Sequence, residues 1–319
     1  MKSKIVLISP AAADANNGNW HTAYRWAKFL SGHCDIAIKQ GWDSTDTDAV
    51  AMIALHARRS AESIHAWAAM RPGTPLIVVL TGTDLYRDIQ GDASARQSLD
   101  MATHLVVLQD AGVAELPANV QGKTRVIYQS APRLKPASKP TQRFTAVMVG
   151  HLRDEKDPLT FMKAAALCHS KHIYFEQIGD GLDTALASAA TRAAKQPNYR
   201  WLGGLARAET RQRIKRAHVL VNSSIMEGGA HVILEAVQSG TPVLASRISG
   251  NMGMLGADYA GYFDVGDAAG LAALVRRCAE EPAFLAHLQN QCAQRAQLFE
   301  PSLEKHLVLN LASAALNLS

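Results

Sequence analysis

The segment at residues 218–247 (HVLVNSSIMEGGAHVILEAVQSGTPVLASR) constrains the fold more than any other part of the chain. It begins with a short, β-branched apolar run of the kind that forms a buried strand. A glycine loop and a helical pattern follow, and Gly240, Thr241 and Pro242 end the helix. A second apolar run occupies residues 243–246. Strand, helix and strand in this order predict one βαβ unit of a parallel sheet.

The helix of this unit combines an apolar body with groups suited to a ligand. Gly228 and Gly229 remove side chains where the helix begins, so that backbone N–H groups can meet an anion. The polar positions of the helix lie four apart and form one stripe: His231, Glu235 and Ser239. Because an unbonded buried carboxylate is unfavourable, we expect Glu235 to face a ligand cleft, with Glu227 in the loop above it. The alternative is that Glu235 pairs with an arginine.

Two glutamates eight positions apart, with the Gly-Gly pair and the Gly-Thr-Pro stop, resemble a known signature. It is the Glu-x7-Glu signature of retaining, GT4-type nucleotide-sugar glycosyltransferases of the two-Rossmann-domain (GT-B) class. The resemblance implies that Glu235 holds the ribose hydroxyls and that Glu227 borders the donor sugar. It also implies further donor-binding residues in three loops: Gly18, Asn19, Leu205, Gly228, Gly229, Ala230 and His231.

Bulk composition narrows the class of protein. A chain of 319 residues, 48% hydrophobic and 19% charged, is long enough for two globular domains and is neither disordered nor fibrous. No apolar run is long enough to span a membrane, and the first ten residues have the pattern of a strand rather than of a secretory signal. The four cysteines lack metal-binding spacing. We therefore expect a cytoplasmic protein. Its net charge of +5 suits anionic ligands, but scattered basic residues and 6% aromatics argue against nucleic acid.

The first part of the chain alternates between apolar runs and helical patterns. The apolar runs occupy residues 4–9, 35–39, 50–55, 76–80, 104–108 and 125–128. Helical patterns occupy residues 20–30, 60–70 and 93–102. This alternation predicts a parallel sheet with helices on both faces. Residues 130–143 (SAPRLKPASKPTQR) follow with three prolines and four basic residues, a composition typical of a linker.

The same alternation then restarts. Strands are predicted at residues 144–149, 172–178 and 199–202, and helices at residues 158–169, 182–195 and 207–216. Together with the resemblance to GT4-type enzymes, this implies an α/β fold of GT-B type, two Rossmann-like domains whose parallel sheets face each other across a cleft. The predicted parts are an N-terminal acceptor domain (1–135), a nucleotide-sugar domain (136–300) and a C-terminal helix (301–319) that crosses back to the first domain.

The first turn of the second domain, residues 150–156 (GHLRDEK), is a predicted phosphate site. Lys156 offers a compact positive charge and Arg153 a planar fork, both at the carboxyl end of a strand. In GT4-type enzymes an arginine follows this glycine and a lysine comes five residues later. Lys156 matches, but His151 replaces the arginine. This leaves open whether Arg153 or a protonated His151 makes the second phosphate contact. A solvated charged turn is the plainer alternative.

Two basic clusters in the first domain predict an anionic second ligand. Residues 56–60 (HARRS) follow the third strand and residues 81–88 (TGTDLYRD) follow the fourth, at the sheet edge where α/β folds bind ligands. The predicted acceptor-binding residues are His56, Arg58, Arg59, Thr83, Arg87 and Arg25, with His56 counted among the cationic groups. Asp84 is expected to bind or position the ligand rather than to abstract a proton. The alternative is that Arg58 or Arg59 pairs with a surface carboxylate.

A closer resemblance covers both domains. The segments ALHARRS, LTGTDLYRD, VIYQSA and VGHLRDEKDP are similar to those of the selenosugar synthases of the selenoneine pathway, a GT-B branch. This implies transfer from a UDP-sugar, expected to be UDP-N-acetylglucosamine, to selenophosphate, with release of UDP and phosphate. No cofactor and no obligatory metal are expected. The expected catalytic residues are Glu227, Lys156, Arg153 and Asp84.

Two other functions fit the sequence. One is a GT4-type glycosyltransferase with an ordinary hydroxyl acceptor, which would need a general base more than a charged selenium nucleophile does. The other is a non-catalytic protein that binds a nucleotide-sugar or an anion.

Overall fold

The computed structural model describes residues 2–11, 18–43, 46–135 and 137–316. The predicted loop at residues 10–19 therefore lies partly outside the described residues, because residues 12–17 are not among them. The chain forms two compact units. The first comprises Met1–Gln129, Glu227–Gly229 and Pro301–Ser319, and the second comprises Ser130–Met226 and Ala230–Glu300.

The first unit contains one six-stranded sheet in which every strand pair is parallel. Its strands are β1 (Lys4–Ile8), β2 (Asp35–Lys39), β3 (Ala49–Leu55), β4 (Leu76–Val79), β5 (His104–Val107) and β6 (Thr124–Val126). The strand order is β2-β1-β3-β4-β5-β6. Each of the six predicted strands is confirmed to within a few residues at its ends.

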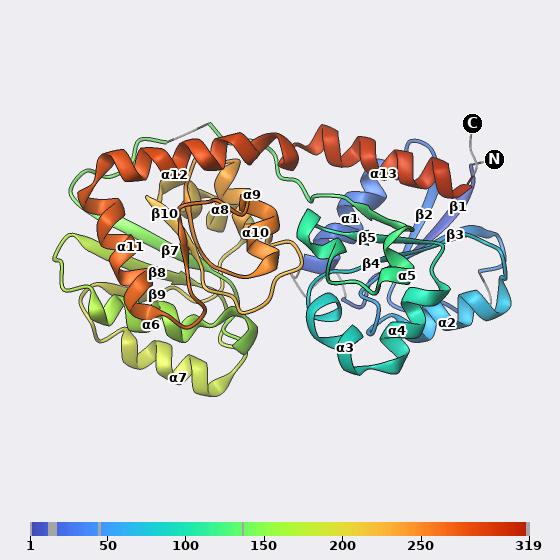
Figure 1. Ribbon diagram of the computed structural model, residues 1–319, viewed down its shortest axis with the longest axis horizontal. Coiled ribbons are helices and arrows are strands. Elements are labelled where there is room, and N and C mark those ends of the chain that lie inside the picture. The colour runs from blue at the N-terminus through green and yellow to red at the C-terminus, as the bar shows by residue number, and fades with distance from the viewer. Residues whose placement is uncertain (1, 12–17, 44–45, 136, 317–319) are drawn as a thin grey trace. The chain divides into compact units, whose positions relative to one another are not determined.

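Helices cover both faces of this sheet (Figure 1). They are α1 (Gly18–Leu30), α2 (Ala61–Met70), α3 (Ile89–Gly91), α4 (Ala93–Met101), α5 (Ala118–Gln121) and α13 (Pro301–Leu316), with short turns η2 (Asp84–Asp88) and η3 (Asp110–Val113). Helices α1 and α13 pack together on one face, and α2 and α4 on the other. Neighbouring strand residues point to opposite faces. Leu7 accordingly joins the core beneath α1 and α13, whereas Val6 joins the core around Trp67.

The second unit contains another parallel six-stranded sheet. Its strands are β7 (Phe144–Val149), β8 (Ile173–Ile178), β9 (Tyr199–Trp201), β10 (Val219–Asn222), β11 (Val243–Ser246) and β12 (Tyr262–Phe263). The order β12-β11-β10-β7-β8-β9 is the doubly wound order of Rossmann folds. The predicted strands are confirmed here too, while β12 was not predicted.

The helices of the second unit also form two layers (Figure 1). They are α6 (Pro158–Leu167), α7 (Thr184–Ala193), α8 (Arg207–Arg216), α9 (His231–Val237), α10 (Ser249–Leu255), α11 (Ala268–Glu280) and α12 (Pro282–Arg295), with turns η4 (Asp154–Lys156) and η5 (Ala296–Phe299). Helices α6, α7 and α11 lie on one face, and α8, α9 and α12 on the other. Within the described residues no helix is long and apolar enough to cross a membrane.

Residues of the predicted linker are bonded to the second unit. The backbone N–H of Leu134 donates to the carbonyl of Gln238 at 2.9 Å. Lys139 Nζ donates to the carbonyls of Lys215 and Ala217, at the end of α8. Burial lowers the pKa of Lys139 to about 8. Since the second unit begins at Ser130, the described residues of this proline-rich segment belong to that unit.

The strand orders locate the ligand-binding edges of both sheets. Open α/β sheets bind ligands outside the carboxyl ends of their strands, where the strand order reverses. The reversal lies between β1 and β3 in the first sheet and between β7 and β10 in the second. His56 directly follows β3, and the turn with Lys156 follows β7. The fold thus brings these predicted residues to the edges where ligands are expected.

Candidate active site

The turn after β7 is held by contacts from the loop after β10. Ser223 Oγ lies 3.0 Å from the carbonyl oxygen of Lys156 and 2.9 Å from that of Asp157. Asp157 adopts the left-handed conformation (φ 43°, ψ 59°), and its side chain caps α6 by accepting from the N–H of Thr160. A side chain at Gly150 would meet the stem of Lys156 at 3.5 Å. The backbone that carries Lys156 is therefore fixed at the switch point of the sheet.

His151 is held in one tautomer beside this turn. Its Nδ1 accepts from the backbone N–H of Asp180 at 3.2 Å, so the neutral ring carries its hydrogen on Nε2. Burial lowers the pKa of His151, although the carboxylate of Asp180 opposes that shift. Of the two alternatives that the sequence left open, this geometry argues against a protonated His151. Arg153 lies exposed where η4 begins.

Glu235 lies on α9 with only 6% of its surface exposed. Its Oε1 is 3.3 Å from Arg207 Nη2 and 3.9 Å from Arg211 Nε, both on α8. The pairing with arginine that the sequence analysis held as an alternative is thus present. It also accounts for how a carboxylate is tolerated on an otherwise apolar helix.

The other predicted donor residues lie in loops around α8 and α9. Leu205 is half-buried between β9 and α8. Glu227 is buried in the loop after β10, and Glu227–Gly229 belong to the first compact unit. Ala230 precedes α9 without a side-chain cap, and His231 is the first residue of that helix. The predicted helix is confirmed, although it ends at Val237, two residues before the predicted end.

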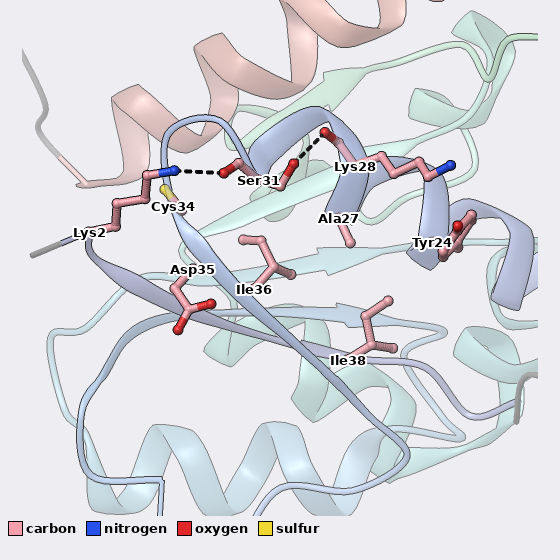
Figure 2. Close-up of a pocket in the computed structure, with 9 residues that line it drawn as sticks. All are labelled: Lys2, Tyr24, Ala27, Lys28, Ser31, Cys34, Asp35, Ile36 and Ile38. Carbon is pink, nitrogen blue, oxygen red and sulfur yellow. Dashed lines mark hydrogen bonds between the residues drawn. The ribbon is translucent and has the colours of Figure 1, made fainter.

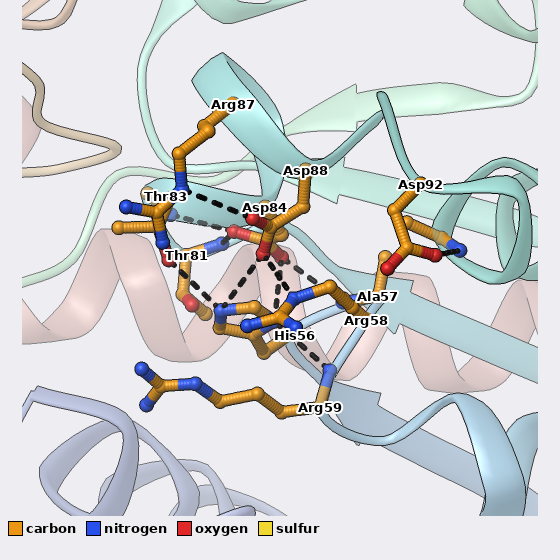
Figure 3. Close-up of polar contacts among 12 residues, drawn as sticks. His56, Ala57, Arg58, Arg59, Thr81, Thr83, Asp84, Arg87, Asp88 and Asp92 are labelled. Carbon is orange, nitrogen blue, oxygen red and sulfur yellow. Dashed lines mark hydrogen bonds and ion pairs between the residues drawn. The ribbon is translucent and has the colours of Figure 1, made fainter. Parts of the chain in front are cut away.

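In the first unit, a fully buried carboxylate joins the two predicted acceptor loops. Asp84 Oδ1 accepts from the backbone N–H groups of Thr81 (2.9 Å) and Gly82 (2.8 Å). Its Oδ2 accepts from the N–H of Ala57 at 3.0 Å (Figure 3). Asp84 has no exposed surface. Because backbone donors occupy both oxygens, Asp84 is suited to position the loops and poorly suited to abstract a proton.

His56 lies against this carboxylate as a neutral hydrogen-bond donor. Its Nδ1 accepts from the N–H of Arg59 at 3.2 Å, which leaves the hydrogen on Nε2, 3.0 Å from Thr83 Oγ1. Burial lowers the pKa of His56, while Asp84 and Asp88 oppose the shift. The sequence analysis counted His56 among the cationic groups. Burial, which sequence spacing does not reveal, makes it neutral instead.

The backbone of His56 is also unusual, with φ at 74°. Left-handed conformations are unfavourable for residues other than glycine and concentrate at functional sites. Among the described residues, two such positions occur: His56 and Asp157. One directly follows β3 and the other directly follows the turn of Lys156. Each unit therefore carries one strained residue at its predicted ligand edge.

A second buried carboxylate holds two of the predicted arginines. Asp88 Oδ2 is 2.9 Å from Arg58 Nε, and its Oδ1 is 3.2 Å from Arg87 Nε. Arg59 is exposed, and its guanidinium extends away from Asp88 in Figure 3. Asp84 and Asp88 begin and end the π-helical turn η2, a form of turn frequent at functional sites. Sequence reasoning missed Asp88, although its spacing of four residues from Asp84 was a usable signal.

Arg25 pairs with a carboxylate on the C-terminal helix α13. Its guanidinium forms two hydrogen bonds, of 2.7 and 2.9 Å, with the fully buried carboxylate of Glu304 on α13. Trp26 Nε1 also donates to Glu304. This arrangement fastens α13 to α1, and the sequence analysis did not foresee it. Gly18 and Asn19 open α1, where the hydroxyl of Thr22 donates to the carbonyl of Gly18.

A shallow pocket of about 420 Å³ lies between α1 and the edge strand β2 (Figure 2). It is lined by Lys2, Tyr24, Ala27, Lys28, Ser31, Cys34, Asp35, Ile36 and Ile38. None of these is a predicted site residue. Within the part of the chain that the structure describes, no group of three or more His, Cys, Asp or Glu side chains is arranged to hold a metal ion.

Comparison with known proteins identifies the family. The family model described as "Glycosyl transferases group 1" matches residues 132–299. The glycosyltransferase 1 domain-containing protein 1 of Xenopus tropicalis is 32% identical over 112 residues, which cover 34% of this chain and 32% of that protein. The match therefore spans about a third of that relative's length.

Solved structures resemble the whole chain. Anabaena HepE, solved in complex with UDP and glucose, has a TM-score of 0.78 at 17% identity, covering 98% of this chain and 100% of that one. Sucrose-phosphate synthase from Thermosynechococcus elongatus has a TM-score of 0.80 at 16% identity, covering 100% of both chains. At such identities these likenesses concern the fold alone, and they confirm the predicted GT-B class. Together with the family match, they show that the chain belongs to the group 1 glycosyltransferase family.

Proposed function

We propose that this glycosyltransferase is a selenosugar synthase, which transfers a sugar from a UDP-sugar to selenophosphate. UDP-N-acetylglucosamine is the proposed donor, on the resemblance of four sequence segments to that branch. The observation that carries the acceptor assignment is the arginine cluster of the first unit. Asp88 holds Arg58 and Arg87 beside the neutral N–H donor of His56. Preorganised cationic forks of this kind suit a small, multiply charged anion.

The donor half of the proposal rests on the second unit. Glu235 is proposed to bind the ribose hydroxyls, and Lys156 and Arg153 to bind the diphosphate. Support comes from family membership and from position: the turn with Lys156 and Arg153 follows β7, and helix α9 with Glu235 follows β10, the two strands at the switch point. His151 would add a neutral Nε2–H donor in place of the usual arginine. Glu227 is proposed to border the sugar. Gly228 and Gly229 beside it pack closely on the first unit, since an added Cβ would lie 2.5 Å from the carbonyl carbon of Thr81 and 2.7 Å from Leu108 Cβ.

The proposed reaction exchanges one bond at the anomeric carbon. Selenium of selenophosphate attacks this carbon, the C–Se bond forms, and the anomeric C–O bond breaks. UDP leaves with the electron pair, and the fixed cationic donors stabilise the charge that develops on it. Water then cleaves the Se–P bond of the glycosylated selenophosphate and releases phosphate. No metal or cofactor takes part in this scheme.

The same cluster disfavours an ordinary hydroxyl acceptor, which would need a general base within reach. The lone pair of His56 Nδ1 accepts from the backbone of Arg59, and the oxygens of Asp84 accept from three backbone N–H groups. Neither group is therefore placed to take a proton. A selenium nucleophile already carries negative charge and has no such requirement.

The direct test measures UDP release from UDP-N-acetylglucosamine with and without selenophosphate. We expect turnover that depends on selenophosphate and yields a product containing a C–Se bond, detected by mass spectrometry. Turnover with glycerol or a simple sugar, indifferent to selenophosphate, would instead support the hydroxyl-acceptor function. Binding of UDP without release from any donor would support the non-catalytic function. Thiophosphate serves as a matched control for the anion.

A further inference from the structure

Two arginines of α8 converge on one oxygen of Glu235. Arg207 Nη2 and Nε lie 3.3 and 3.4 Å from Glu235 Oε1, and Arg211 Nε lies 3.9 Å from the same atom. The arginines are four residues apart, so they occupy one face of the helix. A ribose hydroxyl that bonds to Oε1 would share this oxygen with both guanidinium groups.

The two arginines differ in how firmly they are held. The side chain of Arg211 is 13% exposed, and its Nη2 donates to the carbonyl of Pro132 at 2.6 Å. The side chain of Arg207 is 43% exposed, and its bonds to Glu235 are longer than the usual 2.7–2.9 Å of a charge-assisted bond. Arg211 is therefore an anchored neighbour of Glu235, and Arg207 is a weakly held one.

We infer that Arg207 is a positioning residue that competes with the nucleotide for Glu235, while Arg211 remains as the lasting counter-ion. This inference rests on the proposed role of Glu235 in ribose binding. Before the nucleotide binds, Arg207 holds the Glu235 carboxylate at its observed position. Binding of the ribose then breaks the two long bonds to Arg207 and leaves the Arg211 pair in place. Arg207 thus lowers the affinity for nucleosides by the strength of an exposed ion pair.

Uridine is the cleanest probe of this competition, because it carries the ribose without phosphate charge. An exposed ion pair is weak, so Arg207→Ala should tighten uridine binding by only about two- to five-fold in isothermal titration calorimetry. UDP should tighten by a similar factor. The matched control is Arg213→Ala on the same helix, whose partners are Glu176 and Glu209 rather than Glu235. This control should leave both affinities unchanged.

The dependence of uridine affinity on salt concentration is a second test, because it would not change if Arg207 had only a structural role. Salt screens an exposed ion pair. Raising ionic strength should therefore tighten uridine binding in the unmodified protein and have little effect in Arg207→Ala. Weaker uridine binding in Arg207→Ala, or equal salt dependence in both proteins, overturns the inference.

The Glu235→Ala variant separates this inference from the proposed function. If Glu235→Ala binds UDP with the affinity of the unmodified protein, the proposed ribose site is wrong, and the inferred role of Arg207 is then wrong as well. If Glu235→Ala loses affinity while Arg207→Ala does not gain it, only the competition is wrong. Thermal unfolding of each variant checks that the second unit remains folded.

Discussion

The candidate ligand edges of the two sheets are organised by different chemistry. In the first unit, two buried carboxylates organise the edge. Asp84 accepts hydrogen bonds from the backbone of two loops, and Asp88 pairs with two arginines. In the second unit, a serine hydroxyl and glycines hold the backbone at the corresponding edge. Ser223 bonds to the turn of Lys156, and Gly179 lies so close to Gly150 that an added Cβ would be 2.0 Å from its carbonyl oxygen.

This difference determines how each edge should respond to change. A buried carboxylate that organises backbone loops supports folding and function together, so its loss affects both. In the second unit, glycines and a serine hydroxyl hold the backbone of the loops. The conformation of this backbone therefore does not depend on the charged side chains that the loops carry. Substitution of the buried carboxylates at the first edge should therefore lower stability, and substitution of the charged side chains at the second edge should alter binding.

The largest effect is expected for Asp84→Asn. In this variant the side-chain amide nitrogen would face a backbone N–H donor that bonds to a carboxylate oxygen in the unmodified protein. The negative charge that strengthens the remaining hydrogen bonds would also be lost. Since each hydrogen bond to a charged group contributes about 1.5–3 kcal/mol, the free energy of unfolding should fall by about 3 kcal/mol or more. Denaturant unfolding measures this change.

Asp92→Asn is the matched control for Asp84→Asn. Asp92 caps α4 by accepting from Ser94 and Ala95, and asparagine caps helices about equally well. Its stability should stay near that of the unmodified protein. Equal stabilities of the two variants would contradict the organising role of Asp84.

Glu235→Ala should produce the next largest effect, on binding. Loss of a hydrogen bond to a charged group costs about 1.5–3 kcal/mol, so UDP affinity should fall about 10- to 150-fold. Titration calorimetry measures the affinity, and Glu176→Ala, which removes the carboxylate that pairs with Arg213, serves as the control. UDP affinity that survives in a folded Glu235→Ala protein would remove Glu235 from the proposed site.

A comparison of Arg58→Ala with Arg59→Ala sharpens the contrast within the first unit. Both side chains are exposed, but Arg58 is paired with the buried carboxylate of Asp88, so it is the better preorganised of the two. We expect the KM for selenophosphate to rise about 10-fold in Arg58→Ala, for about 1.4 kcal/mol, and less in Arg59→Ala. UDP affinity should change in neither variant. An equal or larger effect of Arg59→Ala would argue against this assignment.

The smallest effect concerns pH. The pKa of His56 is lowered in the folded protein, so the unfolded chain takes up a proton first as pH falls below about 6.5. Stability should therefore decrease between pH 7.5 and 5.5. Asparagine tolerates a left-handed backbone, so His56→Asn should fold and lose less stability over the same interval. Unfolding at both pH values measures the difference, and equal losses would show that His56 does not titrate as proposed.

Local sequence patterns were enough for most of the fold. Strands β2, β7 and β11 and helix α8 begin and end at the predicted residues, because apolar runs and helical periodicity are local properties. The π-helical turn η2 was not predicted, since its polar sequence has no apolar period. Helix α10 was missed because its sequence (SGNMGML) contains two glycines and little apolar pattern, and β12 because it has only two residues.

The sequence by itself determined the GT-B class and the loops that carry the predicted site residues. Only the tertiary structure decided which partners these residues have. Arg25 pairs with Glu304, 279 positions away, and Asp84 bonds to Ala57 across two loops. Burial then decided the charge of His56. Patterns of residue type predict secondary structure because both are local properties of the chain. The partners of a side chain and its protonation state depend instead on which distant segments pack around it and exclude water.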